Sequence, residues 1–186
     1  MTRVNMFNNI SLDGYFTDRN DDMSWAHGAA GDTELNDFIS ANARASGALV
    51  FGRRTYEMVE TFWTTPIAAQ QMPDVAKAMN RSPKYVFSRS LQKANWASTG
   101  VLTDDPSKEL SRLKRQSGPN LTVLGSGSIV SQLAAAGLID DYQLMIWPVI
   151  LGSGRTLFEG NSLHPVLKLM SCRVFASGRV LLHYTV

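Results

Sequence analysis

Hydrophobic and polar positions follow two different rhythms along the chain, and each rhythm predicts one kind of element. Residues 4–12 form an apolar-rich run that predicts a strand. Across residues 33–45 the apolar side chains Leu35, Phe38, Ile39 and Ala43 recur at helical spacing. Residues 48–51 are a short apolar run that predicts a second strand, and a short helix is expected after Gly52.

The same alternation continues toward the end of the chain. It predicts strands at 84–88, around Val101, at 121–124 and at 140–150 with an interruption at Pro148, and helices at 106–116 and from Ile129 to Gly137. The tail differs, because 171–176 and 179–186 are alternating strands joined by a tight Ser177-Gly178 turn. We therefore predict an α/β fold in three layers, with a mixed sheet that ends in a C-terminal antiparallel hairpin.

Length and composition indicate one globular domain over residues 1–186. Hydrophobic residues make up 44% and the net charge is only +2, which excludes a disordered chain. No internal repeat or long linker divides the sequence. The single Cys172 excludes an internal disulfide, and one cysteine with three histidines excludes a Cys-rich zinc site, so no metal is expected.

The same features bear on location and partners. The first residues lack the apolar core of a signal peptide, and no apolar stretch approaches the length of a membrane span, so we expect a cytoplasmic protein with no membrane contact. The nearly neutral charge gives no reason to expect nucleic-acid binding. A small molecule is the expected partner.

Charge is distributed unevenly along the chain. Residues 1–50 hold three basic and seven acidic side chains, and residues 51–115 hold eleven and six. Residues 116–186 hold four and three. The middle segment is therefore where a bound anion is expected, although a solvated basic face explains the same numbers.

Three predicted strands end in turns suited to anions. In the first, Gly52 allows a sharp turn, and the following helix start presents unpaired N–H groups beside Arg53, Arg54 and Thr55. This is a competent phosphate site. An ordinary glycine turn with Thr55 as a cap and two solvated arginines is the alternative.

The second turn follows the strand at 84–88 and contains Ser88 and Arg89. An arginine fork binds phosphate through two hydrogen bonds, so Arg89 is a candidate reader of the 2′-phosphate that separates NADPH from NADH. An exposed loop arginine is the alternative.

The third turn holds small residues between a buried strand and a helix: Gly125, Ser126, Gly127, Ser128 and Ile129. Small residues let the backbone approach a pyrophosphate while the helix N-terminus faces it. A Rossmann fingerprint is excluded, because Val130 occupies its third glycine position and the acids at 140 and 141 precede the next strand.

The order of these motifs resembles the dihydrofolate reductase fold, and more closely the reductase of riboflavin biosynthesis, the RibD C-terminal domain family. The motifs are Ser-Leu-Asp-Gly at 11–14, Phe-Gly-Arg-Arg-Thr-Tyr-Glu at 51–57, Phe-Ser-Arg-Ser at 87–90, Val-Leu-Gly-Ser-Gly-Ser at 123–128, Gly-Leu-Ile-Asp-Asp at 137–141, and Pro-Val-Ile-Leu-Gly-Ser-Gly at 148–154 with Leu157-Phe158. They span nearly the whole chain in the family's order.

The resemblance implies an NADPH-dependent reductase that forms a homodimer. It implies that residues 52–55 hold phosphates, that Ser88 and Arg89 hold the 2′-phosphate region, and that residues 125–129 hold the pyrophosphate. The substrate would be pteridine-like or an aminopyrimidine, as for dihydrofolate reductase or 5-amino-6-(5-phosphoribosylamino)uracil reductase. The acidic residues 1–50 do not favour the phosphorylated riboflavin intermediate. A binding protein of this fold without turnover is the alternative.

The resemblance also suggests a substrate side. The loop after the first strand would bring Ser11 and Leu12 to the nicotinamide with Asp13 as a catalytic candidate, although an Asp-Gly turn explains Asp13 equally well. Trp25 followed by the catalytic candidate Asp32 resembles the reductase pattern of a Trp before a carboxylate, but Asp32 also stands at a helix N-cap. Phe158 is a further substrate-binding candidate, with a core or interface role as the alternative. His27 in this loop is able to titrate near neutrality, or is simply solvated.

Overall fold

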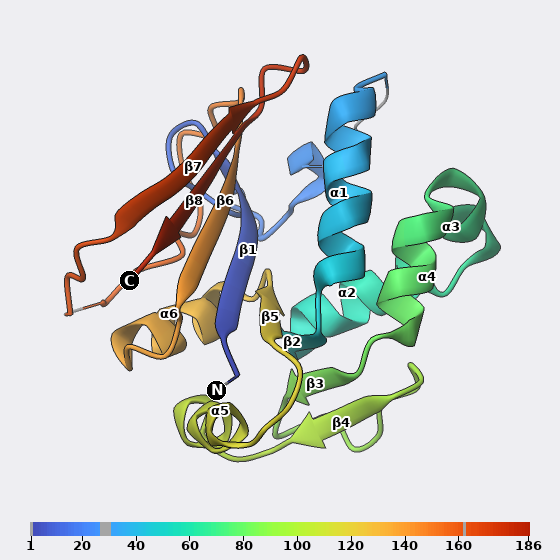
Figure 1. The fold of residues 1–186 in the computed structure, drawn as a ribbon, viewed down its shortest axis with the longest axis vertical. Helices are drawn as coiled ribbons and strands as arrows, with labels where there is room; N and C mark the ends of the chain where they lie inside the picture. Colours follow the sequence, from blue (N-terminus) through green and yellow to red (C-terminus); the bar gives the residue numbers. More distant parts are fainter. Residues whose placement is uncertain (1, 27–30, 162) are drawn as a thin grey trace.

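The fold was obtained as a computed structural model, which describes residues 2–26, 31–161 and 163–186. Eight strands form one sheet in the order β4-β3-β2-β5-β1-β6-β8-β7 (Figure 1). The strands are β1 (Val4–Ser11), β2 (Ala48–Gly52), β3 (Lys84–Phe87), β4 (Thr99–Leu102), β5 (Leu121–Leu124), β6 (Asp141–Trp147), β7 (Lys168–Val174) and β8 (Val180–Thr185). The helices are α1 (Thr33–Ala45), α2 (Arg53–Trp63), α3 (Pro66–Gln71), α4 (Pro73–Arg81), α5 (Pro106–Arg115) and α6 (Gly127–Ala135), with a 3-10 turn at Ser24–Ala26.

The strand directions make the sheet a mixed one. Strands β1 to β6 pair in parallel wherever they are neighbours, whereas β8 is antiparallel to both β6 and β7. Because parallel strands share a direction, the carboxyl ends of β1, β2, β3 and β5 emerge at one edge of the sheet. The turns that follow these strands are the ones that carry the candidate motifs.

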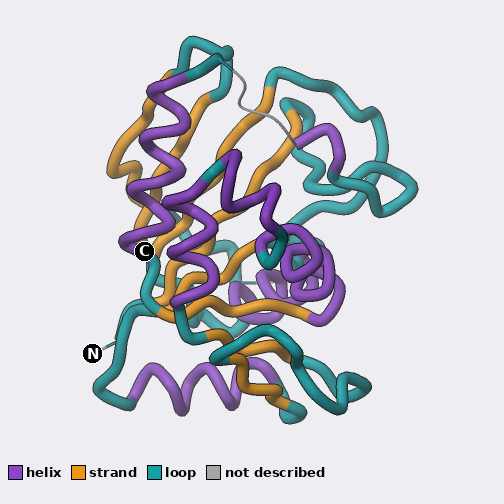
Figure 2. Tube along the Cα trace, turned by 90° about the vertical axis from the view of Figure 1, so that its right-hand side faces the viewer, coloured by secondary structure: helices purple, strands orange, loops and turns teal. Residues whose placement is uncertain are grey.

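Helices cover both faces of the sheet. On one face, α1, α2 and α4 pack their apolar side chains onto β2 and β3 around Phe51 and Tyr56. On the other face, α5 and α6 cover the centre of the sheet with side chains that include Leu110 and Leu133. The helices lie against the strands in both views, and the two chain ends lie on the same side of the molecule (Figures 1 and 2).

The predicted fold class is confirmed: a three-layer α/β fold, mixed in its strand directions and ending in an antiparallel hairpin. The predicted helix at 33–45 has the observed bounds of α1. The predicted long strand at 140–150 ends at Trp147, since Pro148 has no N–H to donate to a neighbouring strand.

Two helices were missing from the sequence prediction. Helices α3 and α4 each begin with a proline, Pro66 and Pro73, which suits the first helical position. Prolines at such close spacing obscure a helical pattern, because each one also interrupts any longer helix. Helix α4 contributes Val75 and Met79 to the core on β2 and β3, whereas α3 packs against α2 and α4.

Candidate functional site

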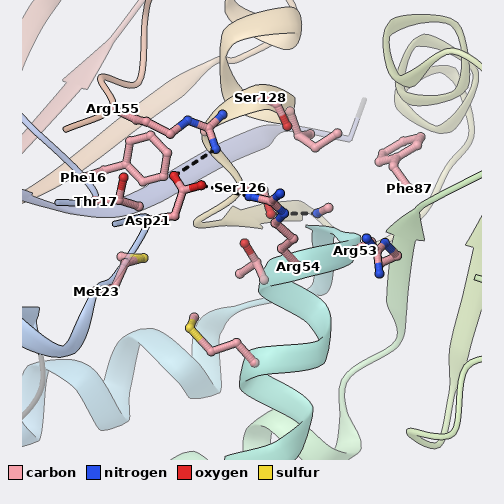
Figure 3. A pocket seen from close by; sticks show the side chains of 15 residues that line it. Phe16, Thr17, Asp21, Met23, Arg53, Arg54, Phe87, Ser126, Ser128 and Arg155 are labelled. Atoms are coloured by element: carbon pink, nitrogen blue, oxygen red, sulfur yellow. Dashed lines mark hydrogen bonds and ion pairs between the residues drawn. The ribbon is translucent and has the colours of Figure 1, made fainter. Parts of the chain in front are cut away.

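A cavity of about 620 Å³ opens at the sheet edge where the parallel strands end (Figure 3). The turn after β2, the turn after β5 and the end of β3 form its floor and one wall. The loop after β1 and Arg155 close it from the opposite side. The lining residues are Phe16, Thr17, Asp21, Met23, Gly52, Arg53, Arg54, Thr55, Met58, Phe87, Ser126, Gly127, Ser128, Ile129 and Arg155.

Two of the predicted turns are held together directly. The backbone N–H of Gly52 donates to Oγ of Ser126 at 2.7 Å, so the end of β2 is fixed to the turn after β5. Ser126 adopts a left-handed conformation with φ of 58°, and Gly125 before it has the same φ. A Cβ atom at Gly125 would lie 3.0 Å from the Thr55 side chain. Glycine is therefore needed there both for the backbone angle and for the close approach of α2.

The same contact places two helix N-termini beside the cavity. Helix α2 begins at Arg53 after Gly52, and α6 begins at Gly127 after Ser126. Neither first turn receives a hydrogen bond from a capping side chain. First-turn N–H groups carry partial positive charge, so two uncapped helix starts favour an anionic ligand. This arrangement joins the predicted residues 52–55 and 126–129 into one site.

Charged side chains add to this field. Arg53 pairs with Glu57 of its own helix at 3.1 Å. Arg54 and Arg155 approach from different segments and both pair with Asp21, at 3.0 Å and 3.5 Å (Figure 3). The wall of the cavity thus carries three guanidinium groups and one carboxylate.

The loop after β1 contributes lining residues that the sequence analysis did not identify. Thr17 forms an isolated antiparallel bridge with Arg155, which brings the loop after β1 to the segment after β6. Gly154 makes this possible, because a Cβ atom there would lie 1.9 Å from the Thr17 carbonyl oxygen. The Thr17 Oγ1 atom is buried and has no hydrogen-bond partner among the residues that the structure describes. A buried hydroxyl without a partner at a cavity wall is a candidate ligand contact.

Ser88 and Arg89 follow Phe87, the last residue of β3, which lines the cavity. The Ser88 Oγ atom accepts hydrogen bonds from the N–H groups of Ser90 and Leu91, at 3.2 Å and 2.9 Å. This hydroxyl therefore shapes the turn. Neither Ser88 nor Arg89 is among the lining residues, so a contact of Arg89 with a 2′-phosphate stays a prediction.

Asp13 connects two loops. Its carboxylate accepts the Ser11 hydroxyl at 2.6 Å and the N–H groups of Leu151 and Gly152 at 3.1 Å and 2.7 Å. The Ser11 hydrogen bond, followed by that of Gly152, holds the pKa of Asp13 below its usual value. An ionised carboxylate with these partners fixes the segment after Pro148. A catalytic role for Asp13 stays a prediction.

Asp32 is the N-cap of α1. Its carboxylate accepts the N–H of Leu35 at 3.0 Å and the N–H of Ser177 at 2.9 Å. A hydrogen bond from the Ser177 side chain, followed by the one from the Leu35 N–H, holds the pKa of Asp32 below its usual value. The capping interpretation of Asp32 is therefore confirmed, and its catalytic role stays untested.

The substrate-side candidates lie apart from the cavity lining. Ser11 is fully buried and Leu12 is exposed. The Trp25 ring meets Trp147 edge to face at 6.0 Å, and Phe158 contacts Tyr142 at 6.1 Å. His27 lies outside the described residues. The structure thus gathers most of the predicted cofactor residues but does not join the substrate candidates to them.

No helix in the described part of the chain has the length and apolar character needed to cross a membrane. Within the same residues, no group of three or more His, Cys, Asp or Glu side chains is arranged to hold a metal ion.

Comparison with known proteins gives matches over almost the whole chain. The family model of the RibD C-terminal domain matches residues 2–181. The uncharacterized protein YyaP of Bacillus subtilis (strain 168) is 27% identical over 179 residues, which cover 94% of this chain and 90% of YyaP. Among solved structures, a protein named for riboflavin biosynthesis from Shewanella sp. PV-4 has a TM-score of 0.73 at 19% identity, covering 99% of this chain and 98% of its own. Dihydrofolate reductase from Enterococcus faecalis, complexed with NADP(H), has a TM-score of 0.62 at 12% identity, covering 98% and 95%. The two structural matches share the fold.

Proposed function

Because the chain belongs to the RibD C-terminal domain family, we propose that it is an NADPH-dependent reductase that reduces a pteridine-like or aminopyrimidine substrate. The family and the reductases that share its fold support an oxidoreductase. The observation that carries the proposal is the cavity at the strand ends, where two uncapped helix N-termini and three arginines meet.

The residues present fit a dinucleotide phosphate. The cavity of about 620 Å³ is open enough for an extended ligand. The small residues Gly52, Ser126 and Gly127 line it beside the two helix starts, whose N–H groups favour phosphate oxygens. The buried Thr17 hydroxyl offers one further polar contact. The donor set therefore suits two linked phosphates better than an apolar ligand.

Each part of the site would have its own task. The N–H groups of Gly127 and Ser128 and the side chains of Arg54 and Arg155 would bind phosphate oxygens, because the N–H of Ile129 already donates to the Ser126 carbonyl at 2.8 Å. Ser126 keeps the two turns in register through its hydrogen bond with Gly52. Bound NADPH would supply the hydride, and the chain would supply orientation and exclusion of water. Phe16 and Met23 contribute apolar surface to the lining of the cavity. The loop at 149–152, fixed by Asp13, would border the substrate.

The direct test is a fluorescence titration of the purified protein with NADPH and with NADH. We expect saturable binding with a preference for NADPH, followed by NADPH oxidation when dihydropterin, dihydrofolate or aminopyrimidine substrates are added. Absence of binding for both nucleotides would contradict the proposal. Binding without turnover on any of these substrates would favour a nucleotide-binding protein of the same fold.

We also propose a cytoplasmic homodimer. Strand β7 forms one edge of the sheet, and all seven of its residues are exposed. Three of them, Leu169, Met170 and Val174, are large and apolar. An exposed apolar edge strand is a hazard for a monomer, and pairing with a second copy would cover it. Size-exclusion chromatography with light scattering measures the mass directly.

A further inference from the structure

Arg54 and Arg155 converge on a carboxylate that the chain itself supplies. Arg54 lies in the first turn of α2, and Arg155 lies in the segment between β6 and β7. Their guanidinium groups reach Oδ2 and Oδ1 of Asp21, at 3.0 Å and 3.5 Å, so that one carboxylate bridges two arginines inside the cavity wall (Figure 3). Two arginines around one anion is the arrangement by which proteins bind phosphate.

We propose that Asp21 is a resident counter-anion, which holds Arg54 and Arg155 in place and yields them to a phosphate or pyrophosphate group of the ligand. This inference rests on the proposed function for the identity of the ligand. The competition between Asp21 and a phosphate group for the two arginines does not depend on that identity. Asp21 thereby becomes a residue that determines which anions the cavity accepts.

The local backbone presents this carboxylate in a defined position. Asp21 has a left-handed backbone with φ of 61°, and its N–H donates to the Asp18 carbonyl at 3.2 Å. The Asp18 carboxylate in turn accepts the N–H groups of Asn20 and Asp22 at 2.7 Å and 2.9 Å. The turn therefore closes on itself without the Asp21 side chain, which is free to change partner without unfolding the loop.

The exposure of the three side chains makes the exchange favourable. Arg54 is 75% exposed and Asp21 is 45% exposed, so their pair is weakened by water. A phosphate carries more charge and accepts the two guanidinium groups with stronger hydrogen bonds. A singly charged anion such as chloride gains less from the same two arginines, so it displaces Asp21 from them less readily. The cavity therefore selects for multiply charged groups.

Isothermal titration with inorganic pyrophosphate tests this exchange without any nucleotide. We expect Asp21→Asn to bind pyrophosphate about 3- to 10-fold more tightly than the wild type, since one or two weak surface ion pairs no longer compete. Asparagine and glycine both tolerate the left-handed backbone, so Asp21→Gly is a second variant with the same expected gain. In the Arg54→Ala/Arg155→Ala background, the Asp21→Asn gain should disappear.

Asp74→Asn is the matched control. It removes the same charge from a surface pair with Arg44, remote from the cavity, and should leave the pyrophosphate affinity unchanged. Equal or weaker pyrophosphate binding by both Asp21 variants would overturn the inference, and so would absence of pyrophosphate binding in all variants. If the protein binds NADPH but neither Asp21 variant binds pyrophosphate more tightly, the counter-anion role of Asp21 is refuted and the proposed function is not. A gain for pyrophosphate without NADPH binding refutes the nucleotide and retains the counter-anion.

Discussion

Replacing Lys84 with methionine should change how the stability of the protein depends on pH. Lys84 begins β3 and is only 1% exposed. Its Nζ atom donates to the carbonyl oxygens of Asn80, Ser82 and Ala97 at 3.2, 2.7 and 3.2 Å, and it lies 4.4 Å from the centre of the Trp96 ring. These partners are neutral, so burial lowers the pKa of Lys84 from 10.5 to about 8.

The sign and size of the effect follow from these two pKa values. Between them the unfolded chain holds a proton that the folded chain has released, so folding becomes more favourable as the pH rises. Each pKa unit corresponds to about 1.4 kcal/mol, so the whole effect is about 3 kcal/mol. Between about pH 7 and about pH 9.5, the Lys84 contribution to the free energy of unfolding should increase by about 2 kcal/mol.

Urea unfolding across this pH range measures the effect in wild type and Lys84→Met. The methionine variant loses three hydrogen bonds but also the buried charge, so its stability at one pH is not diagnostic. The diagnostic quantity is the difference in the free energy of unfolding between wild type and Lys84→Met as a function of pH. This difference should grow in favour of the wild type as the pH rises. Lys77→Met, which removes an exposed lysine from α4, should follow the wild type. Parallel curves for wild type and Lys84→Met would refute a lowered pKa.

Three further changes test the site and the assembly. Arg89→Ala should weaken NADPH binding by about tenfold and leave NADH unchanged if Arg89 binds the 2′-phosphate, and equal losses in the two titrations would contradict that role. Gly127→Ala should lower the free energy of unfolding by about 1–3 kcal/mol, because the new Cβ atom would lie 2.3 Å from the Phe16 ring. Gly100→Ala meets nothing closer than 3.7 Å and is its control in the same urea experiment. Met170→Glu on β7 should halve the mass measured by light scattering if β7 forms the dimer contact, and an unchanged dimer would place that contact elsewhere.

Gly127 shows where sequence reasoning found the right residue for an incomplete reason. A glycine between a buried strand and a helix predicts close approach by a phosphate. In the structure, the position of its absent Cβ is taken by the ring of Phe16, which is itself buried and lines the cavity. Gly127 is therefore required by protein packing before any ligand arrives. A loss of cofactor binding in a Gly127 variant is informative only when the fold is shown to be intact.

Local sequence patterns were sufficient to predict that the turns after β2 and β5 belong to the site. Both turns follow parallel strands, whose ends necessarily meet at one edge of the sheet, so Gly52 and residues 126–129 were predictable as neighbours. The opposite wall was not predictable in this way. A single antiparallel bridge between two irregular segments brings Thr17 to Arg155. The pattern of hydrophobic and polar residues cannot predict such a contact, because neither segment is a regular helix or strand. The Ser-Leu-Asp-Gly motif at 11–14 correctly indicated a residue with a specific task. In the structure the Asp13 carboxylate accepts hydrogen bonds from the loop at 149–152 and thereby fixes that loop.

The charge pattern along the chain illustrates the same limit. The excess of basic residues at 51–115 indicated where an anion would bind, and Arg53 and Arg54 from this segment do line the cavity. However, Arg155 comes from the nearly neutral last segment and Asp21 from the acidic first one. The field inside the cavity is thus set by residues from all three segments, and Coulomb interactions depend on distance in space. Asp21 lies in the acidic first segment, where the count of charges predicts no phosphate site. In the structure it forms ion pairs with both Arg54 and Arg155 in the cavity wall, which is where we propose that a phosphate binds.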